Sequence, residues 1–256
     1  MNKSISEMKE MLDEGKITSE ELFKEAHDKA IKYQDEYNSF VTIMDEYKIE
    51  GDGILKGIPY ALKDNVSTRG ILTTASSNIL SNYVPVYDAT IYEKLKKAGA
   101  ILVGKTVLDE LAMGGTGTTG HTGVVRNPWC KERLIGGSSA GSAAAVALGI
   151  VPFSIGSDTG DSIRKPAAYG GIVGFKPTYG RISRYGLFAF ASSLDHLGVM
   201  ARNVYDTAMV MNVVKGHDDK DMTSLPDDGK DYLATINDSV KGRKLFYIKE
   251  ALENKD

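Results

Sequence analysis

Three segments of the sequence combine lysine or serine with small residues in a way that suits nucleophilic chemistry. They are "PYALKDN" with Lys63, "GGSSAGSAAA" with Ser138 and "GSDTGDSIRKP" with Ser162. A serine becomes nucleophilic without histidine when burial lowers the pKa of a nearby lysine, because the neutral amine can then accept a proton. A second hydroxyl can relay that proton, and backbone amides of a glycine-rich turn can stabilise an oxyanion. The alternative is that these runs are only tight turns into close-packed helices.

Taken together and in this order, the three segments resemble the amidase signature family, whose members hydrolyse or transfer amides with a Ser, cis-Ser, Lys triad. The resemblance implies that Lys63 is the base, and that Ser138 is the bridging serine, with a cis peptide. It implies that Ser162 is the nucleophile that forms the acyl-enzyme. The implied oxyanion hole consists of the backbone amides of Thr159, Gly160, Asp161 and Ser162.

The resemblance covers almost the whole chain and is strongest to one branch of the family, the glutaminase subunits of bacterial tRNA-dependent amidotransferases. It is carried by "AGAILVGKT", "RNPW", "VGFKPTYGRISRYGLFAFASSLDHLG" and "GHDDKDMTS". The resemblance implies that Ser162 attacks the side-chain amide of glutamine and that the released ammonia converts Glu-tRNA(Gln) into Gln-tRNA(Gln). The alternatives are a stand-alone amidase for small amides and a catalytically inactive fragment.

The same resemblance implies partners. A B subunit would carry the kinase and transamidase chemistry, would use ATP and magnesium, and would make most of the tRNA contacts, while a small C subunit would join the assembly. No cofactor is expected in this chain itself. Whether Asp-tRNA(Asn) is also served stays open. Because the chain is much shorter than members of the family, we expect it to be truncated at its C-terminus and to lack the C-terminal half of the fold.

Three positions near the implied site depart from the family's pattern. Asp161 replaces the glycine before the nucleophile, Lys165 replaces a glutamine, and Ala140 replaces a glycine. A carboxylate at position 161 would oppose a developing oxyanion unless it is neutralised, and Lys165 is the candidate partner. If position 161 requires a positive φ, aspartate tolerates it less well than glycine. The alternative is that both side chains point into solvent and have no role.

Other motifs suggest different chemistry. "GAILVGKT", residues 99–106, matches the spacing of a phosphate-binding loop, but its apolar interior also fits a buried strand that ends at a turn. "GSSAG" fits the nucleophile elbow of a hydrolase centred on Ser139, with His196 and His217 further along, although the preceding segment reads as a loop. Cys130 has neighbours of both charge signs, which do not favour a thiolate.

The fold class follows from alternating patterns after residue 53. Short apolar runs, "IPYAL", "AILVG", "VPFSIG" and "GIVGF", alternate with helix-like segments, which predicts an α/β fold. We expect an N-terminal helical segment over residues 1–48. We expect an amidase core over residues 49–256, with a mixed, mostly parallel sheet flanked by helices.

Local patterns predict individual elements. One helix is expected before Gly15, and Thr18 with Glu21 forms a capping box for a second helix. Residues 216–231 read as a charged loop, and "KLFYI", residues 244–248, reads as a strand. The apolar stripe of the second helix consists of Leu22, Phe23, Ala26, Ala30 and Ile31.

The overall composition is that of a globular protein without a strong charge bias. The 256 residues are 42% hydrophobic and carry a formal net charge of −3, which gives no general attraction to nucleic acid or anionic membranes. No apolar run reaches the length of a membrane span, and no secretory signal is recognisable, so we expect a cytoplasmic protein. The single cysteine excludes an internal disulfide, and no zinc site is expected.

Overall fold

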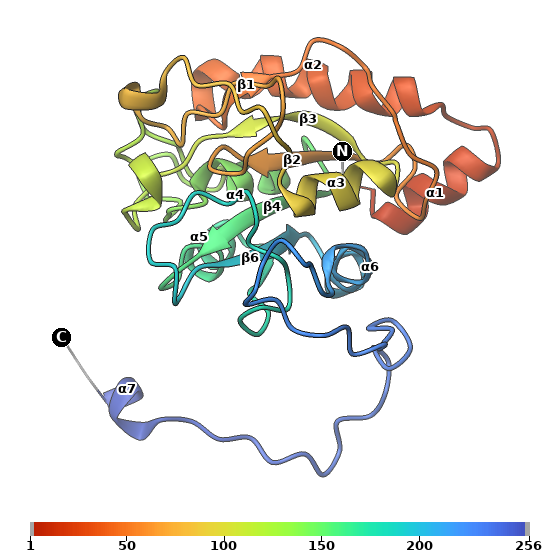
Figure 1. Ribbon diagram of the computed structural model, residues 1–256, viewed down its shortest axis with the longest axis vertical. Coiled ribbons are helices and arrows are strands. Elements are labelled where there is room, and N and C mark those ends of the chain that lie inside the picture. The colour runs from red at the N-terminus through yellow and green to blue at the C-terminus, as the bar shows by residue number, and fades with distance from the viewer. Residues whose placement is uncertain (1–2, 254–256) are drawn as a thin grey trace.

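A mixed sheet of six strands forms the centre of the computed structural model, which describes residues 3–253 (Figure 1). The strand order is β1-β3-β2-β4-β6-β5. The strands are β1 (Phe40–Ile43), β2 (Pro59–Lys63), β3 (Ile101–Thr106), β4 (Phe153–Asp158), β5 (Val173–Phe175) and β6 (His196–Ala201).

The strand directions confirm the predicted mixed, mostly parallel sheet. β2 pairs in parallel with both β3 and β4, whereas β1 is antiparallel to β3, and β6 is antiparallel to both β4 and β5. Four strands, β2 to β5, therefore run in one direction, and β1 and β6 run in the other. As a consequence, the carboxyl ends of β2, β3 and β4 meet at one edge of the sheet.

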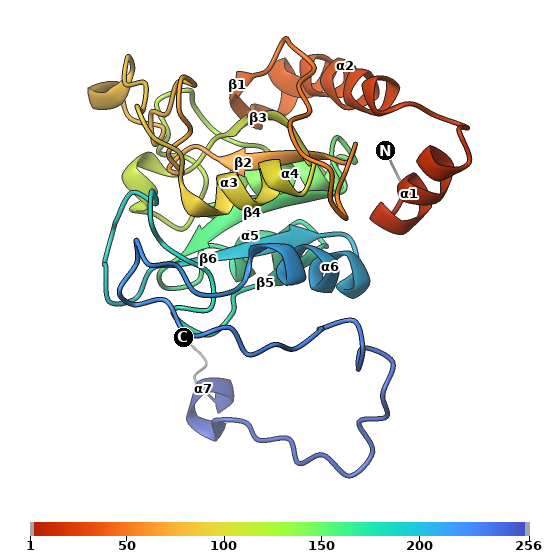
Figure 2. The same cartoon turned by 45° about the vertical axis from the view of Figure 1, so that its right-hand side comes forward.

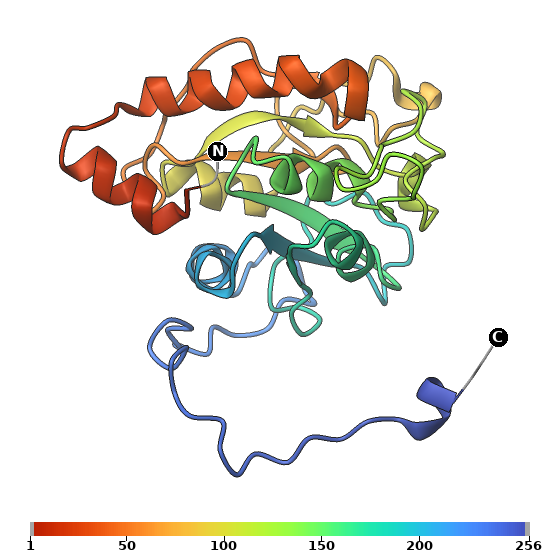
Figure 3. The same cartoon turned by 180° about the vertical axis from the view of Figure 1, so that it is seen from behind.

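Helices cover both faces of the sheet, as predicted. α3 and α6 contact each other on one face, and α4 and α5 lie on the opposite face, which Figure 3 shows from behind. α2 runs along the side of the sheet formed by β1 and β3. The helices are α1 (Ile5–Asp13), α2 (Ser19–Tyr37), α3 (Thr90–Lys97), α4 (Ala140–Ala147), α5 (Arg164–Tyr169), α6 (Val204–Val214) and α7 (Lys249–Glu253), with short 3₁₀ turns at Asn78–Leu80 and Glu110–Ala112.

Both N-terminal helices begin directly after a residue whose side chain caps the helix N-terminus. Thr18 caps α2 through the predicted capping box with Glu21, and Ser4 with Glu7 forms a second one at α1. The stripe of α2 is buried at Leu22, Phe23, Ala26 and Ala30, but the prediction for Ile31 is wrong, since its side chain is 54% exposed at the border of the stripe. β1 lies before residue 48 and already belongs to the sheet, and the domain boundary there stays a prediction.

Small residues allow α4 to lie close against the centre of the sheet. α4 contacts β2, β3, β4 and β6, and its residues from Ala140 to Val146 are buried. A Cβ atom at Gly141 would lie 2.2 Å from the carbonyl oxygen of Ser39, so only glycine fits this approach. The close packing fixes the start of α4, where Ser138 and Ser139 lie, next to the strands.

The C-terminal part of the chain contains one confirmed prediction and one wrong one. Residues 216–231 form the expected loop, whereas residues 244–248 are not a strand. This last segment follows a long excursion away from the sheet (Figure 2), and its apolar side chains from Leu245 to Ile248 are 71–94% exposed. No strand within the described residues pairs with it, and a strand forms only with a hydrogen-bonding neighbour. Within residues 3–253, no helix combines the length and apolar character needed to cross a bilayer.

Candidate active site

The predicted site residues gather where β2 and β4 end. Lys63 is the last residue of β2, and Asp158 is the last residue of β4. A short turn leads from Asp158 through Ser162 into α5, and Ser138 lies in the loop just before α4. Because β2 and β4 are adjacent and parallel, their carboxyl ends place these segments side by side.

Lys63 and Ser138 are in direct contact. Lys63 Nζ lies 2.8 Å from Ser138 Oγ, and both side chains are fully buried. The same Nζ lies 2.8 Å from Ser157 Oγ and 3.3 Å from the Ser157 carbonyl oxygen. The peptide between Gly137 and Ser138 is cis. The lysine amine is thus surrounded by oxygen atoms of two serines.

The surroundings of Lys63 favour the neutral amine far more than water does. Burial lowers the pKa of Lys63 to about 7, against the opposing effect of the carboxylates of Asp109, Asp158 and Asp195. No carboxylate in the described part of the chain forms an ion pair with its Nζ. At neutral pH a large fraction of the amine can therefore accept a proton.

Ser162 lies beside this pair. Its carbonyl oxygen accepts a hydrogen bond of 3.1 Å from the backbone N–H of Ser139, and the residue is 7% exposed. Within residues 3–253, no hydrogen bond joins Ser162 Oγ to Ser138 Oγ. The structure thus brings Lys63 and Ser138 into contact and holds Ser162 next to them through the backbone.

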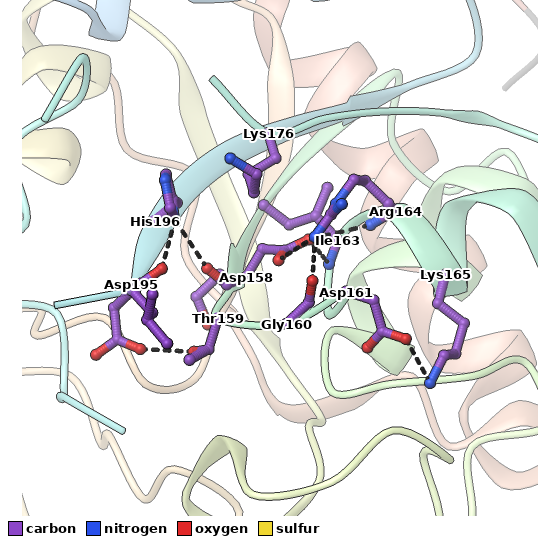
Figure 4. A network of polar contacts seen from close by, with 12 residues as sticks. Asp158, Thr159, Gly160, Asp161, Ile163, Arg164, Lys165, Lys176, Asp195 and His196 are labelled. Atoms are coloured by element: carbon purple, nitrogen blue, oxygen red, sulfur yellow. Dashed lines mark hydrogen bonds and ion pairs between the residues drawn. The ribbon is translucent and has the colours of Figure 1, made fainter. Parts of the chain in front are cut away.

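The turn before Ser162 offers free backbone donors. In the part of the chain that the structure describes, the N–H groups over residues 159–162 have no protein acceptor. The Asp158 carboxylate closes the turn by accepting from Ile163 N at 3.0 Å and from Arg164 Nε and Nη2, each at 3.1 Å (Figure 4). Burial alone would raise the pKa of Asp158, but these hydrogen bonds outweigh it and lower the pKa. Amides held in this way can stabilise an oxyanion.

Asp161 and Lys165 form the ion pair that their charges suggested. Lys165 Nζ lies 2.6 Å from Asp161 Oδ2 (Figure 4), with side chains that are 32% and 47% exposed. Asp161 does not adopt a positive φ, so the replacement of glycine causes no strain of that kind. Lys165 also lies against the neighbouring loop, since a Cβ at Gly115 would be 2.8 Å from its Nζ. The two side chains are therefore paired although both are partly exposed to solvent, and whether the pair has a role at the site stays a prediction.

Asp109 supports the segment that carries Ser138. Its backbone N–H donates to the Ser138 carbonyl oxygen at 3.2 Å, and its carboxylate accepts from the amides of residues 116–119 at 2.9–3.2 Å. Burial would raise the pKa of Asp109, but the hydrogen bonds from this loop lower it. No local pattern marked Asp109 in the sequence, because its partners become neighbours only when the loop folds around it.

The phosphate-loop alternative does not fit the structure. Residues 101–106 form the fully buried strand β3, so their amides cannot curl around a phosphate. Lys105 is also fully buried, and its Nζ lies 3.3 Å from Asp64 Oδ1. The motif is a strand that ends at a turn.

The other two alternatives also lack the necessary contacts. Ser139 Oγ donates to the Ser157 carbonyl oxygen, whereas His196 Nδ1 contacts backbone carbonyl oxygens (Figure 4) and His217 contacts Ser224. Cys130 Sγ donates to a Glu132 carboxylate oxygen at 3.2 Å and contacts no histidine within the described residues. Among the residues that the structure describes, no cluster of His, Cys, Asp or Glu could hold a metal ion.

Comparison with known proteins decides the family. The model of the family described as Amidase matches residues 21–255. The chain belongs to the amidase signature family. Two similar members are the A subunits of glutamyl-tRNA(Gln) amidotransferase from Carboxydothermus hydrogenoformans and Streptococcus pneumoniae. They are 48% and 47% identical to this chain over 260 and 262 residues, which is 96% and 98% of its length.

Solved structures of amidase signature proteins share the fold. The A subunit of glutamyl-tRNA(Gln) amidotransferase from Thermotoga maritima superposes with a TM-score of 0.89 at 42% identity, over 94% of this chain and 52% of that one. The peptide amidase from Stenotrophomonas maltophilia gives a TM-score of 0.86 at 30% identity, over 92% of this chain and 53% of that one. The chain spans about half the length of the curated relatives it matches, 54% in both cases above.

Proposed function

We propose that this chain carries the glutaminase chemistry of a tRNA-dependent amidotransferase and releases ammonia from glutamine. The observation that carries the proposal is a fully buried lysine amine, 2.8 Å from Ser138 Oγ and with a pKa lowered to about 7, beside the segment of Ser162. A neutral lysine next to two serines is the arrangement that a histidine-free serine nucleophile requires. The names of two similar relatives, A subunits of glutamyl-tRNA(Gln) amidotransferase, support an amide-transfer role, and glutamine is the proposed amide donor.

The proposed first step forms a bond between Ser162 Oγ and the carboxamide carbon. The Ser162 proton passes to Ser138 Oγ while the Ser138 proton passes to Lys63 Nζ, so the relay needs a hydrogen bond between the two serines. Catalytic hydrogen bonds of this kind often tighten only in the substrate complex. The carbonyl oxygen becomes an oxyanion, and the free amides over residues 159–162 are its proposed donors.

Collapse of this intermediate breaks the carbon–nitrogen bond. The proton on Lys63 returns through Ser138 to the leaving nitrogen, so ammonia departs as a neutral molecule and a glutamyl ester remains on Ser162. Water then attacks the ester, and its proton passes through Ser138 to Lys63. When this second intermediate collapses, the carbon–oxygen bond to Ser162 breaks and the proton returns through Ser138 to Ser162 Oγ, so glutamate is released and the free serine is restored. The lysine begins and ends the cycle neutral, which is why a pKa near neutrality suits it.

The proposal includes partners in the cytoplasm. Ammonia would be used by a B subunit that activates Glu-tRNA(Gln) with ATP and magnesium and makes most of the tRNA contacts, and a small C subunit would join the two. This chain would need no cofactor of its own. Co-purification of tagged chain with co-expressed B and C subunits tests the assembly, and recovery of the chain alone would contradict it.

The nucleophile can be tested without the complete glutamine pocket. A fluorophosphonate reacts with an activated serine by forming an oxygen–phosphorus bond and releasing fluoride, and peptide mass spectrometry locates the adduct. We expect labelling of Ser162 in the wild type, no adduct at that position in Ser162→Ala, and labelling slowed by about 10²- to 10⁴-fold in Lys63→Met. The exposed Ser239 provides a control, and Ser239→Ala should react like the wild type. Equal labelling of wild type and Ser162→Ala would contradict the assignment.

A second candidate function is a stand-alone amidase. It is favoured by the superposition on a peptide amidase with a TM-score of 0.86. Ammonia release from glutamine, from a C-terminal peptide amide and from an arylamide separates the two functions when measured on the chain alone and with its co-expressed subunits. Turnover of glutamine that depends on the subunits supports the amidotransferase, whereas turnover of the other amides without glutamine turnover supports the amidase.

A further inference from the structure

We propose that Ser157 is a positioning residue that, together with Asn65, directs the free lone pair of the Lys63 amine at Ser138 Oγ. This inference rests on the proposed function and deepens it. Neither residue belongs to the triad, and neither is expected to touch the substrate. Their role is to orient the Lys63 amine. The two N–H groups of the neutral amine donate to Ser157, and the hydroxyl of Ser138 donates its proton to the amine.

Strand register places Ser157 beside Lys63. β2 and β4 pair in parallel with Leu62 opposite Ile155, so Lys63 and Ser157 both lie at the ends of these strands. Asn65 follows Lys63 by two residues in the turn after β2. Ser157 is 5% exposed and Asn65 is 1% exposed, so water does not readily replace their hydrogen bonds.

Ser157 is held in place at its backbone and at its side chain. Its carbonyl oxygen accepts from Ser139 Oγ at 3.0 Å, and its N–H lies 3.3 Å from the same hydroxyl. Its own Oγ accepts from Asn65 Nδ2 at 3.0 Å. The carbonyl oxygen can only accept, the Oγ already accepts one hydrogen bond before Lys63 is considered, and Lys63 Nζ contacts both of these atoms.

The hydrogen bonds that Lys63 Nζ can make depend on whether the amine is protonated. An ammonium has three N–H groups, and three oxygen atoms surround it: Ser138 Oγ, Ser157 Oγ and the Ser157 carbonyl oxygen. The neutral amine has only two N–H groups and one lone pair. A carbonyl oxygen can only accept, and the Asn65 amide holds Ser157 Oγ where it can accept the second N–H. If both N–H groups stay on Ser157, the lone pair faces Ser138, whose hydroxyl then donates to Nζ.

Removing the Ser157 hydroxyl has two expected effects. The neutral amine loses one of the two acceptors that orient it, so proton transfer from Ser138 slows. The ammonium loses a hydrogen bond, so its proton leaves at lower pH. The charged groups around Lys63, namely the carboxylates of Asp109, Asp158 and Asp195, are the same in the variant, so they do not cause the difference.

The test is the pH dependence of Ser162 labelling by a fluorophosphonate in the full chain. In Ser157→Ala we expect the limiting rate to fall roughly 10- to 100-fold, as for loss of a hydrogen bond to a charged group, and the midpoint of the rise in rate to move to lower pH. Ser157→Thr keeps the hydroxyl and should recover most of the rate. Ser154→Ala is the matched control, because Ser154 is buried on the same strand and its hydroxyl donates to the Ser142 carbonyl oxygen, away from Lys63.

A titration of Lys63 gives a readout that does not depend on labelling. NMR of lysine with ¹³C at the Cε position should show Lys63 deprotonating at lower pH in Ser157→Ala than in the wild type. An unchanged rate and an unchanged titration in Ser157→Ala would overturn the inference, and so would a faster rate, because Ser157 would then be the hydroxyl that donates to Nζ. Absence of Ser162 labelling in the wild type, with the titration shifted as expected, would instead refute the proposed function alone.

Discussion

Lys63 and Lys105 are both fully buried lysines on adjacent parallel strands, yet their amines meet different partners. Lys63 Nζ contacts serine oxygens, and no carboxylate within residues 3–253 contacts it. Lys105 Nζ lies 3.3 Å from Asp64 Oδ1 and donates to Val66 O and Thr73 Oγ1, each at 2.9 Å. Burial lowers the pKa of both lysines, but only at Lys105 does a contacting carboxylate hold the proton. Burial alone therefore does not make a lysine suited to act as a base. The atoms that contact its amine determine whether it keeps its proton.

The largest expected effect is on stability at Lys105. Lys105→Met leaves the buried Asp64 carboxylate without its cation, so we expect the free energy of unfolding to fall by about 3–5 kcal/mol. Urea unfolding measures this loss. Lys63→Met is the matched control, and it should cost less than half as much because it leaves behind uncharged oxygen atoms of Ser138 and Ser157 and no buried carboxylate.

The double variant Lys105→Met with Asp64→Asn sharpens the comparison. It removes both charges, so it should recover part of the stability lost in Lys105→Met. Equal losses of stability in the Lys105→Met and Lys63→Met variants would contradict the distinction between a lysine in an ion pair and a lysine surrounded by uncharged oxygen atoms.

A second prediction concerns the dependence of stability on pH. Lys63 has a folded pKa of about 7, below the unfolded value of 10.5, so between these values the unfolded chain binds more protons at this site than the folded chain does. The free energy of unfolding of the wild type should therefore rise with pH relative to Lys63→Met, by up to about 1.4 kcal/mol per pH unit. Urea unfolding at several pH values between 7 and 10 measures the difference. A constant difference would mean that Lys63 keeps an ordinary pKa.

The smallest expected effect is at the partly exposed pair of Asp161 and Lys165. Lys165→Gln removes the cation from a carboxylate next to the proposed oxyanion hole, so we expect Ser162 labelling to slow about three- to tenfold. The free energy of unfolding should change by at most about 1 kcal/mol, as for other exposed ion pairs. Adding Asp161→Gly to Lys165→Gln removes the carboxylate as well, and the labelling rate should return. If the double variant stays as slow as Lys165→Gln, charge compensation is not the reason for the pair.

Local signals in the sequence were sufficient for several elements. The capping box at Thr18 and the apolar run of β3 depend on neighbouring residues alone, and both predictions are confirmed. The strand expected over residues 244–248 is wrong, because an apolar run becomes a strand only when another strand pairs with it, and the described chain supplies none. The exposure of Ile31 likewise depends on what α2 packs against.

The site was only partly predictable for the same reason. The resemblance to the amidase signature family named Lys63 and Ser138, which the structure brings into contact, and their catalytic roles stay predictions. Ser157, Asn65 and Asp109 were not found. Their contacts depend on the register between β2 and β4 and on a loop that closes on itself, and no pattern of neighbouring residues encodes either.

The crowding at Gly137 has a consequence for protein engineering. A Cβ atom there would lie 2.0 Å from Asp109 Oδ2, and that carboxylate cannot move aside, since the amides of residues 116–119 hold it. Saturation mutagenesis should therefore recover only glycine at this position. Because the loop over residues 109–119 packs against the segment over residues 136–139, the two must be exchanged together when related proteins are recombined. A chimera between relatives should keep its activity only when both pieces come from the same parent.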